Sequence, residues 1–129
     1  MQIAHVETFL VDRFIFLEIT TDTGLVGLGE GGAWAFPEAT VGTVQRFREY
    51  LIGRDPLLIE HHWQALYRWS HFRGSAIMAA LSAIGIALWD IAGKHFCAPI
   101  HALLGGRIRH KARAYYHVFA RRRMSSTMA

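Results

Sequence analysis

The sequence predicts an α+β fold, in which an antiparallel meander of three strands is followed by a bundle of helices. Two observations support this prediction. Apolar and polar residues alternate with period two over residues 2–31, whereas apolar residues recur at helical spacing over residues 37–95. The chain has 129 residues, of which 52% are hydrophobic and 19% charged, a composition that suits one globular domain with a substantial core.

Three strands are expected at the beginning of the chain. Residues 3–10 alternate, a tight connection follows at Asp12 and Arg13, and residues 14–19 alternate again. Residues 21–24 (Thr-Asp-Thr-Gly) have the composition of a turn whose glycine can take positive φ, and residues 25–28 form a third short strand. Short turns between consecutive strands predict an antiparallel meander.

Helices are expected after the strands. Pro37 suits the first turn of one helix, and Gly53 suits its C-terminal end. A second helix follows Pro56, and Ser75 is the expected N-cap of a third helix over residues 75–95. The alanines of this third helix permit a neighbouring element to approach closely.

The third helix is expected to be a buried core helix. The uncharged run at residues 74–89 is shorter than the roughly 20 residues that a membrane span needs. Asp90 and Lys94 are four positions apart, which predicts an ion pair on one helix face. Pro99 opens a last short turn that closes at residues 105–106 (Gly-Gly).

The C-terminal part of the chain is basic, and the net charge is +4. Residues 112–119 have the pattern of a further strand, and residues 121–129 are expected to be a disordered tail. Because the basic residues lack interleaved aromatic residues, we expect no nucleic-acid partner and no membrane partner.

The N-terminus lacks the pattern of a secretory signal, which favours a cytoplasmic protein. The single cysteine, Cys97, excludes an internal disulfide and is expected to be a small buried residue.

Three short motifs mimic functional sites. Residues 22–24 (Asp-Thr-Gly) match the aspartic-protease triplet, but a hairpin turn requires the same residues. Residues 27–32 match G-x-G-x-x-G, although an antiparallel hairpin precedes them and Pro37 delays the helix. Residues 60–62 (Glu-His-His) do not converge as metal ligands because neighbours on a helix point apart, so we interpret them as a solvated helix face.

The region from residue 82 to residue 106 carries the most specific pattern. Residues 82–94 read Ser-Ala-Ile-Gly-Ile-Ala-Leu-Trp-Asp-Ile-Ala-Gly-Lys, and Pro99-Ile100 and residues 103–106 (Leu-Leu-Gly-Gly) follow. This pattern resembles the N-terminal capping domain of the mandelate racemase/muconate-lactonizing branch of the enolase superfamily. Gly85 departs from the family, which usually has an acidic or amide side chain there.

Two further segments refine the resemblance, which covers residues 2–119. Residues 51–56 (Leu-Ile-Gly-Arg-Asp-Pro) and residues 63–68 (Trp-Gln-Ala-Leu-Tyr-Arg) look most like acid-sugar dehydratases of the galactonate and mannonate type. The tail after Ala120 does not resemble the family. We therefore expect a truncated or out-of-frame end, or an isolated fragment.

The resemblance implies a TIM-type barrel after the capping domain. Members of the family hold Mg²⁺ and their Lys or His acid/base residues on later barrel strands. We accordingly expect no catalytic residue and no metal ligand in this chain, which would bind no Mg²⁺ alone. The expected organisation is a capping domain at residues 1–106, a linker and first barrel strand at residues 107–120, and the basic tail at residues 121–129.

The function that the resemblance implies is that of a capping and substrate-specificity domain of a Mg²⁺-dependent acid-sugar dehydratase. Its substrate would be a sugar acid, and the protein is expected to be a homo-oligomer. A racemase or cycloisomerase of the same superfamily, or a non-catalytic α+β interaction module, remains an alternative. For each candidate residue named below, packing within the domain is the alternative to a contact with substrate. The candidate substrate-facing residues are Asp12, Arg13, Trp34, Phe36, Arg73 and His117.

Overall fold

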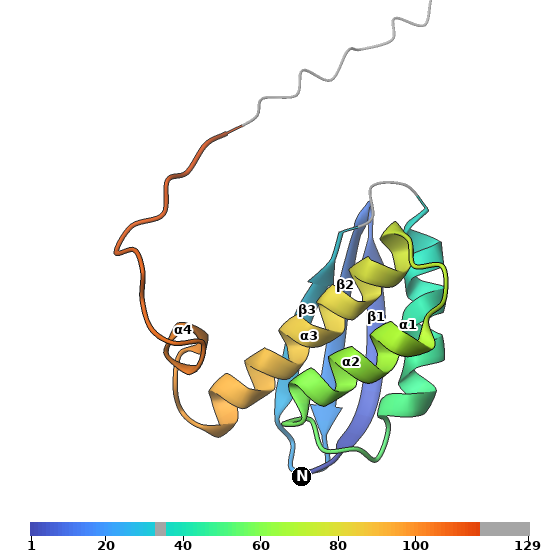
Figure 1. Ribbon diagram of the computed structural model, residues 1–129, viewed down its shortest axis with the longest axis horizontal. Coiled ribbons are helices and arrows are strands. Elements are labelled where there is room, and N and C mark those ends of the chain that lie inside the picture. Colours follow the sequence, from blue (N-terminus) through green and yellow to red (C-terminus); the bar gives the residue numbers. More distant parts are fainter. Residues whose placement is uncertain (33–35, 117–129) are drawn as a thin grey trace, which may run out of the picture.

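The computed structural model describes residues 1–32 and 36–116, and it confirms the α+β architecture (Figure 1). A three-stranded sheet is followed by four helices in chain order. The strands are β1 (Ile3–Val11), β2 (Phe14–Thr21) and β3 (Val26–Gly31). The helices are α1 (Pro37–Leu51), α2 (Ile59–Trp69), α3 (Ser75–His95) and the short α4 (Ile100–Leu103).

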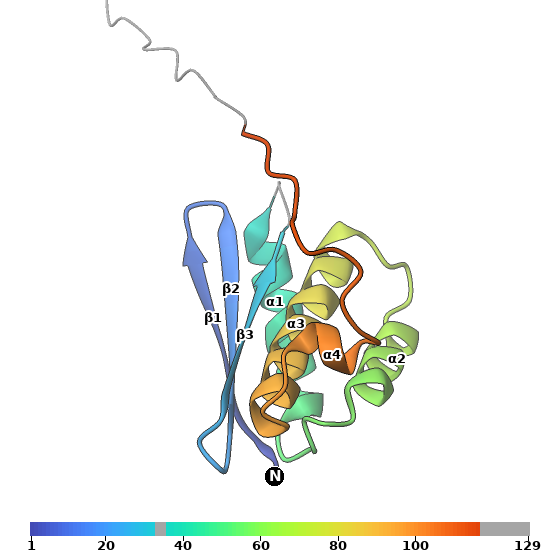
Figure 2. The ribbon, with the colours of Figure 1, turned by 90° about the vertical axis from the view of Figure 1, so that its left-hand side faces the viewer.

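The sheet has the order β1-β2-β3, and both pairs of neighbours are antiparallel. Phe9 lies opposite Phe16 across the first pair, and Leu17 lies opposite Gly29 across the second. Helices cover one face of this sheet and leave the other face open (Figure 2). An irregularity between Ile3 and His5 shifts the register of β1, so that Ile3 is buried together with Val6.

The core lies between the sheet and α3. On β2 the side chains of Ile15, Leu17 and Ile19 are fully buried, as the alternating pattern predicted. The buried face of α3 supplies the opposite wall. By length and composition α3 could cross a membrane, but half of that apolar window is buried among the other elements. The helix therefore acts in this fold as the core helix that the sequence predicted.

Glycines on β3 allow α3 to pack against the strand backbone. A Cβ atom added to Gly29 would lie 2.0 Å from the Ala83 carbonyl oxygen, and one added to Gly27 would lie 2.1 Å from that of Ala87. Two of the three glycines that matched a dinucleotide motif, Gly27 and Gly29, are thus packing residues on alternate positions of an antiparallel strand. This strand, at six residues, extends further than the sequence predicted.

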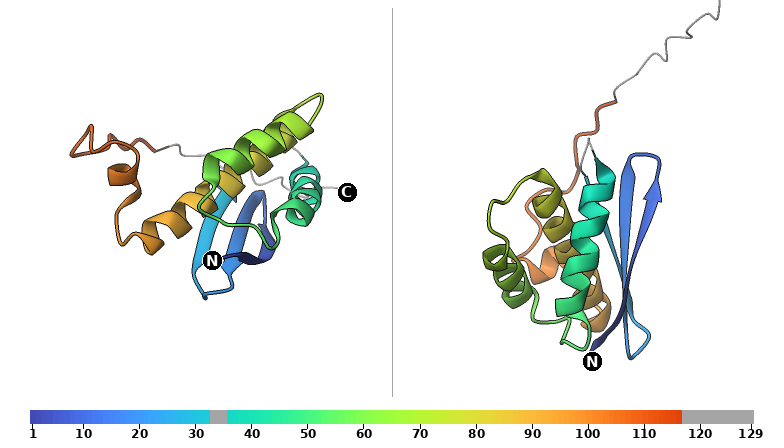
Figure 3. Two further views of the ribbon diagram at one scale, coloured as in Figure 1. Left: turned by 60° about the horizontal axis from the view of Figure 1, so that its bottom comes forward. Right: turned by 90° about the vertical axis from the view of Figure 1, so that its right-hand side faces the viewer.

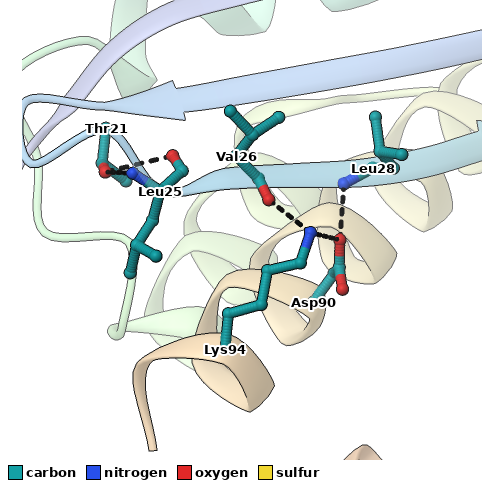
Figure 4. A network of polar contacts seen from close by, with 6 residues as sticks. All are labelled: Thr21, Leu25, Val26, Leu28, Asp90 and Lys94. Atoms are coloured by element: carbon teal, nitrogen blue, oxygen red, sulfur yellow. Dashed lines mark hydrogen bonds and ion pairs between the residues drawn. The ribbon is translucent and has the colours of Figure 1, made fainter. Parts of the chain in front are cut away.

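A polar network joins α3 to the outer edge of β3 (Figure 4). The predicted ion pair is confirmed, with Lys94 Nζ 2.8 Å from Asp90 Oδ2. The same two side chains also bind the strand: Leu28 N–H donates to Asp90 Oδ2 at 2.9 Å, and Lys94 Nζ donates to the Val26 carbonyl oxygen at 2.6 Å. Side chains of α3 therefore satisfy backbone groups that would otherwise lie open at the sheet edge.

Three local predictions are wrong. Gly74, and not Ser75, is the N-cap of α3, and no side chain caps that helix. His62 is buried rather than solvated, because Nε2 lies 2.8 Å from the Asp55 carbonyl oxygen and Nδ1 lies 3.3 Å from the Tyr50 hydroxyl. Cys97 is exposed, because it lies in the turn after α3 with φ of 50°.

Residues 112–116 are exposed and form no strand in the described part of the chain. A strand needs neighbours to pair with, and the structure offers none there. Residues 117–119 of the predicted strand lie outside the described residues. The first barrel strand therefore stays a prediction.

Candidate functional site

Several described segments of the chain gather at one end of the molecule, which we call the loop-bearing end. The β1–β2 turn lies there, β3 ends there, α1 begins there, and the α2–α3 connection reaches it (Figures 1 and 2). The N-terminus and the β2–β3 turn lie at the opposite end. This arrangement brings together the segments that carry Asp12, Arg13, Phe36 and Arg73, which are far apart in the sequence.

The β1–β2 turn contains Asp12 and Arg13. Asp12 has φ of 55°, a left-handed conformation that aspartate tolerates better than most residues because its short side chain can hydrogen-bond locally. The guanidinium of Arg13 lies over the ring of Phe14, with its central carbon 5.2 Å from the ring centroid. A carboxylate and a cation therefore lie side by side at the end of an exposed hairpin.

The strands next to this turn expose apolar side chains. Phe9 pairs with Phe16 and Val11 pairs with Phe14, so these four side chains share one face of the hairpin. Together with Leu10 they are 40–55% exposed. We call these five residues the hairpin tip. Leu10 lies on the opposite face, because it pairs with the buried Ile15. Exposed apolar side chains that share one face, as the other four do, are typical of a surface that contacts another protein part or a ligand.

Phe36 precedes α1 as its N-cap residue, and its side chain is 78% exposed. Its φ of 58° is unfavourable for a bulky residue, and such conformations cost of the order of 1–3 kcal/mol. Pro37 occupies the first turn of the helix, as predicted. Trp34, the other predicted aromatic of this segment, lies outside the described residues.

Arg73 lies in the α2–α3 connection and packs against α2. Its Nε donates to the Tyr67 carbonyl oxygen at 2.9 Å, and its guanidinium lies 3.8 Å from the centroid of the Tyr67 ring. These contacts hold the side chain of Arg73 against α2, which favours the interpretation that this residue packs locally over the interpretation that it contacts substrate. Phe72, which was not predicted, is fully exposed beside it with φ of 53°. His117 lies outside the described residues.

A hollow of about 530 Å³ lies between α1 and the α2–α3 connection. Arg46 stacks on Trp69 at 5.0 Å at its wall, and Arg46 also forms an ion pair with Glu49. Ser70 and Ile77 complete the lining that faces the connection. This hollow could not be predicted from the sequence, because its lining residues come from three helices whose arrangement depends on the fold.

No group of three or more His, Cys, Asp or Glu side chains within residues 1–32 and 36–116 is placed to hold a metal ion. The donor set that Mg²⁺ requires is therefore not among the described residues, and no catalytic step through Mg²⁺ is assigned to them. The two groups with shifted pKa values, His62 and Asp90, have structural partners elsewhere in the fold.

The fold identifies the class of protein to which the chain belongs. A three-stranded antiparallel sheet followed by helices is the architecture of the N-terminal domain of enolase-superfamily proteins. The family profile described as mandelate racemase / muconate lactonizing enzyme, N-terminal domain, matches residues 1–105. The chain belongs to this family.

Two relatives are D-galactonate dehydratases. The chain is 41% identical to the protein from Verminephrobacter eiseniae and 43% identical to that from Pectobacterium atrosepticum, in each case over 117 residues. These alignments cover 89% of this chain and 31% of each relative. The chain thus spans about a third of the length of these proteins.

Solved structures show the same fold. A member of the enolase superfamily from Salmonella Typhimurium superposes with a TM-score of 0.78 at 33% identity, over 84% of this chain and 30% of that one. The 3,6-anhydro-D-galactonate cycloisomerase from Zobellia galactanivorans superposes with a TM-score of 0.76 at 33% identity, over 82% and 32% of the two chains.

Proposed function

We propose that this chain is the capping domain of an acid-sugar dehydratase, and that its loop-bearing end covers the substrate. The main support is that the β1–β2 turn, the end of β3, the beginning of α1 and the α2–α3 connection gather at one end (Figure 1), in a chain 41–43% identical to two D-galactonate dehydratases. The active site itself would be formed by a barrel domain, because the described residues include no metal-binding group.

The candidate residues have distinct roles in this proposal. Arg13 binds the substrate carboxylate, since a guanidinium can donate two parallel hydrogen bonds to it. Asp12 accepts a hydrogen bond from a sugar hydroxyl. Phe36 and Trp34 cover the substrate and exclude water. Arg73 and His117 are further contacts, and Arg73 would use its Nη atoms because its Nε already binds Tyr67.

The dehydration would proceed outside this domain. A base would remove the proton α to the carboxylate, and an acid would donate a proton to the hydroxyl on the β carbon, which leaves as water while a carbon–carbon double bond forms. The capping domain would contribute by closing over the substrate and by selecting among sugar acids through its loops. Mutations at the loop-bearing end are therefore expected to change which sugar acid reacts more than they change the chemistry.

A chimera tests the proposal. Residues 1–106 of this chain would replace the corresponding domain of the Pectobacterium D-galactonate dehydratase, and kcat/KM would be measured over a panel of acid sugars with Mg²⁺. We expect dehydration by the chimera, and a loss of roughly tenfold or more in kcat/KM for Arg13→Ala, as for a lost charged hydrogen bond. Arg68→Ala, at an exposed position on α2, is the matched control.

Two results would contradict the proposal. One is a folded chimera that turns over no sugar acid; the other is turnover by the 129-residue chain alone.

A cycloisomerase is the second candidate function, because the Zobellia cycloisomerase shares the fold at 33% identity. Conversion of an anhydro-sugar acid, without dehydration of any open-chain acid, would favour it. A partner bound through the hairpin tip, with no turnover by the chimera, would favour the non-catalytic interaction module.

A further inference from the structure

The hollow between α1 and the α2–α3 connection has the size and the lining of a small-molecule site. Its volume of about 530 Å³ lies within the range of ligand pockets, and apolar groups form much of its wall. Figure 3 (right) shows α1 beside this connection. The lining residues of α1 recur at helical spacing from Ala39 to Arg46, so they share one face of the helix, and Trp69 and Ile77 line the hollow from α2 and α3.

Gly42 keeps the α1 side of this hollow open. It lies in the interior of α1, where glycine disfavours the helix relative to other residues. A Cβ atom added to Gly42 would meet nothing within 4 Å, so no close packing against another element requires glycine there. A larger side chain at this position would extend into the hollow instead. The chain thus has a helix-weakening residue at the position where a side chain would fill the hollow, which favours a site for a ligand.

Two hydroxyl groups at the wall can accept hydrogen bonds from a ligand but cannot donate to it. Thr43 Oγ1 donates to the Ala39 carbonyl oxygen at 2.8 Å, and Ser70 Oγ donates to the Leu66 carbonyl oxygen at 2.9 Å. A hydroxyl has one hydrogen to donate and two lone pairs that accept. A ligand that matches these two oxygens therefore carries hydrogen-bond donors.

Arg46 supplies a positive charge at the same wall. Its guanidinium lies over the Trp69 ring, with the central carbon 5.0 Å from the ring centroid, and Nη1 forms an ion pair with Glu49. A guanidinium has five N–H donors, so the nitrogen Nη2 is left to donate to a ligand. A matching ligand therefore also carries an anionic acceptor.

We propose that this hollow binds a polyhydroxy carboxylate, that is, a sugar acid. The carboxylate accepts from Arg46, two hydroxyls donate to Thr43 and Ser70, and the carbon chain packs on Trp69 and Ile77. A neutral polyol would leave Arg46 without an anionic partner, and a fatty acid would leave both hydroxyl oxygens without a donor, so each fits less well. The hollow includes none of the candidate substrate-facing residues, and its ligand class does not rest on the proposed dehydration.

A ligand in the hollow would join two segments of the loop-bearing end. Thr43 and Arg46 belong to α1, whereas Ser70 belongs to the α2–α3 connection that also carries Phe72. A sugar acid held from both sides would restrain the connection relative to α1. We therefore expect slower hydrogen exchange at the Phe72 amide when the ligand is bound.

Titration calorimetry of the 129-residue chain tests the ligand class, with compounds of equal carbon-chain length and at constant ionic strength. We expect gluconate to bind saturably, and to bind at least roughly tenfold more tightly than sorbitol, which lacks the carboxylate, or hexanoate, which lacks the hydroxyls. No saturable binding of gluconate, or equal binding of either comparison compound, would overturn the proposal. Because this measurement needs no turnover, its failure is distinguishable from an inactive chimera.

A substitution that fills the hollow tests the location of the site. Gly42→Leu places a side chain in the hollow and also favours the helix. This variant should therefore bind gluconate at least roughly tenfold more weakly, without a loss in the free energy of unfolding. Gln45→Leu, at an exposed position of α1 outside the hollow, is the matched control and should bind gluconate as the unmodified chain does. Unchanged affinity of a folded Gly42→Leu variant would place the ligand elsewhere and contradict the proposal.

Glu49→Gln tests the role of the charge. The substitution removes the carboxylate that competes with the ligand for Arg46. Gluconate should then bind more tightly, whereas the affinity for sorbitol should not change. Equal gluconate affinities of Glu49→Gln and the unmodified chain would exclude Arg46 as the group that holds the carboxylate.

Discussion

At the scale of single residues, small side chains and one histidine explain much of the packing. Gly85 lies in the interior of α3, where a Cβ atom would meet nothing within 4 Å. Gly93 lies on the same helix, but a Cβ atom there would approach the Ala98 carbonyl oxygen at 3.1 Å. The resemblance to the family pattern singled out Gly85 as unusual, and the structure shows that a side chain at this position would meet open space.

Gly85→Ala is expected to stabilise the chain by about 1 kcal/mol, since alanine restricts the unfolded chain and favours the helix. Gly93→Ala is the matched control on the same helix. Its free energy of unfolding should rise little, because the new methyl group is crowded. Denaturant unfolding measures both changes in the free energy of unfolding. A loss of stability in Gly85→Ala would show that this position does not tolerate a side chain.

His62 should make stability depend on pH. Burial is the main cause that lowers the pKa of this imidazole below 6.5, and the charge of Arg54 acts in the same direction. The unfolded chain therefore takes up the proton first, so stability is full above pH 6.5 and declines as the pH falls toward the lower folded pKa.

His62→Gln keeps a donor for the Asp55 carbonyl oxygen and removes this titration. We expect the free energy of unfolding of this variant to vary less between pH 7 and pH 5 than that of the unmodified chain. His101→Gln, at an exposed position on α4, serves as the control and should leave the pH dependence unchanged. Identical pH profiles for the unmodified chain and His62→Gln would show that another group is responsible.

At the scale of helices and strands, the sequence predicted which elements exist and in what order they follow, but it did not predict which elements contact one another. The alternation of Ile15, Leu17 and Ile19 is a local signal, so β2 was predicted correctly. The docking of β3 on α3 was missed, because it depends on glycines and alanines more than fifty positions apart. Of the candidate site residues, Asp12, Arg13 and Phe36 lie at a common end of the molecule, but their contact with substrate stays a prediction. The sequence could not show that Arg73 packs on Tyr67, because that contact depends on how the chain turns after α2.

Gly29→Ala is expected to destabilise the contact between β3 and α3 by about 1–3 kcal/mol, as overpacking does. The new methyl group would overlap the Ala83 carbonyl, which is backbone and cannot rotate away. Gly32→Ala, where a Cβ atom meets nothing within 4 Å, is the control with the same chemical change. Thermal unfolding would show a lowered Tm for the first variant only; equal Tm values would mean that α3 can shift to make room.

Asp90→Ala should release the outer edge of β3, because Leu28 N–H and Lys94 lose their shared acceptor. We expect a loss of about 1 kcal/mol and faster hydrogen exchange at the Leu28 amide. Glu49→Ala breaks a more exposed ion pair and should change stability by less than about 0.5 kcal/mol. Unchanged exchange at Leu28 would exclude a role of Asp90 at this edge.

The contribution of the Asp90 carboxyl group to stability depends on pH. Partial burial raises the pKa of Asp90, but hydrogen bonds from Lys94 and the Leu28 N–H, with the charge of Lys94, bring it below 3.8. The stabilisation is therefore present above pH 3.8 and is lost as the pH falls through the lower folded value. The difference in stability between Asp90→Ala and the unmodified chain should shrink in that acidic range.

At the scale of the whole molecule, the core formed by the described residues lies before the C-terminal segment. The buried hydrophobic residues run from Ile3 to Ala92, whereas residues 107–116 are exposed. The family profile also ends at residue 105. These observations support the prediction that residues 1–106 form the folding unit.

Deletion of residues 107–129 should therefore change the free energy of unfolding by less than about 0.5 kcal/mol. Deletion from residue 99 onward, which removes α4 and the Ile100 side chain that lies next to Gly93, is the comparison and should lower the free energy of unfolding by more. Denaturant unfolding of both shortened chains measures the difference. A large loss on removing residues 107–129 alone would place the domain boundary further along the chain.

The placement of the N-terminus has a practical consequence. Met1 lies at the end opposite the loops that we propose to face substrate (Figure 1). Immobilisation or fluorescent labelling at Met1 would thus leave those loops accessible to solution. Because Met1 also packs against the core, such an attachment needs a short flexible spacer so that the first residues keep their position.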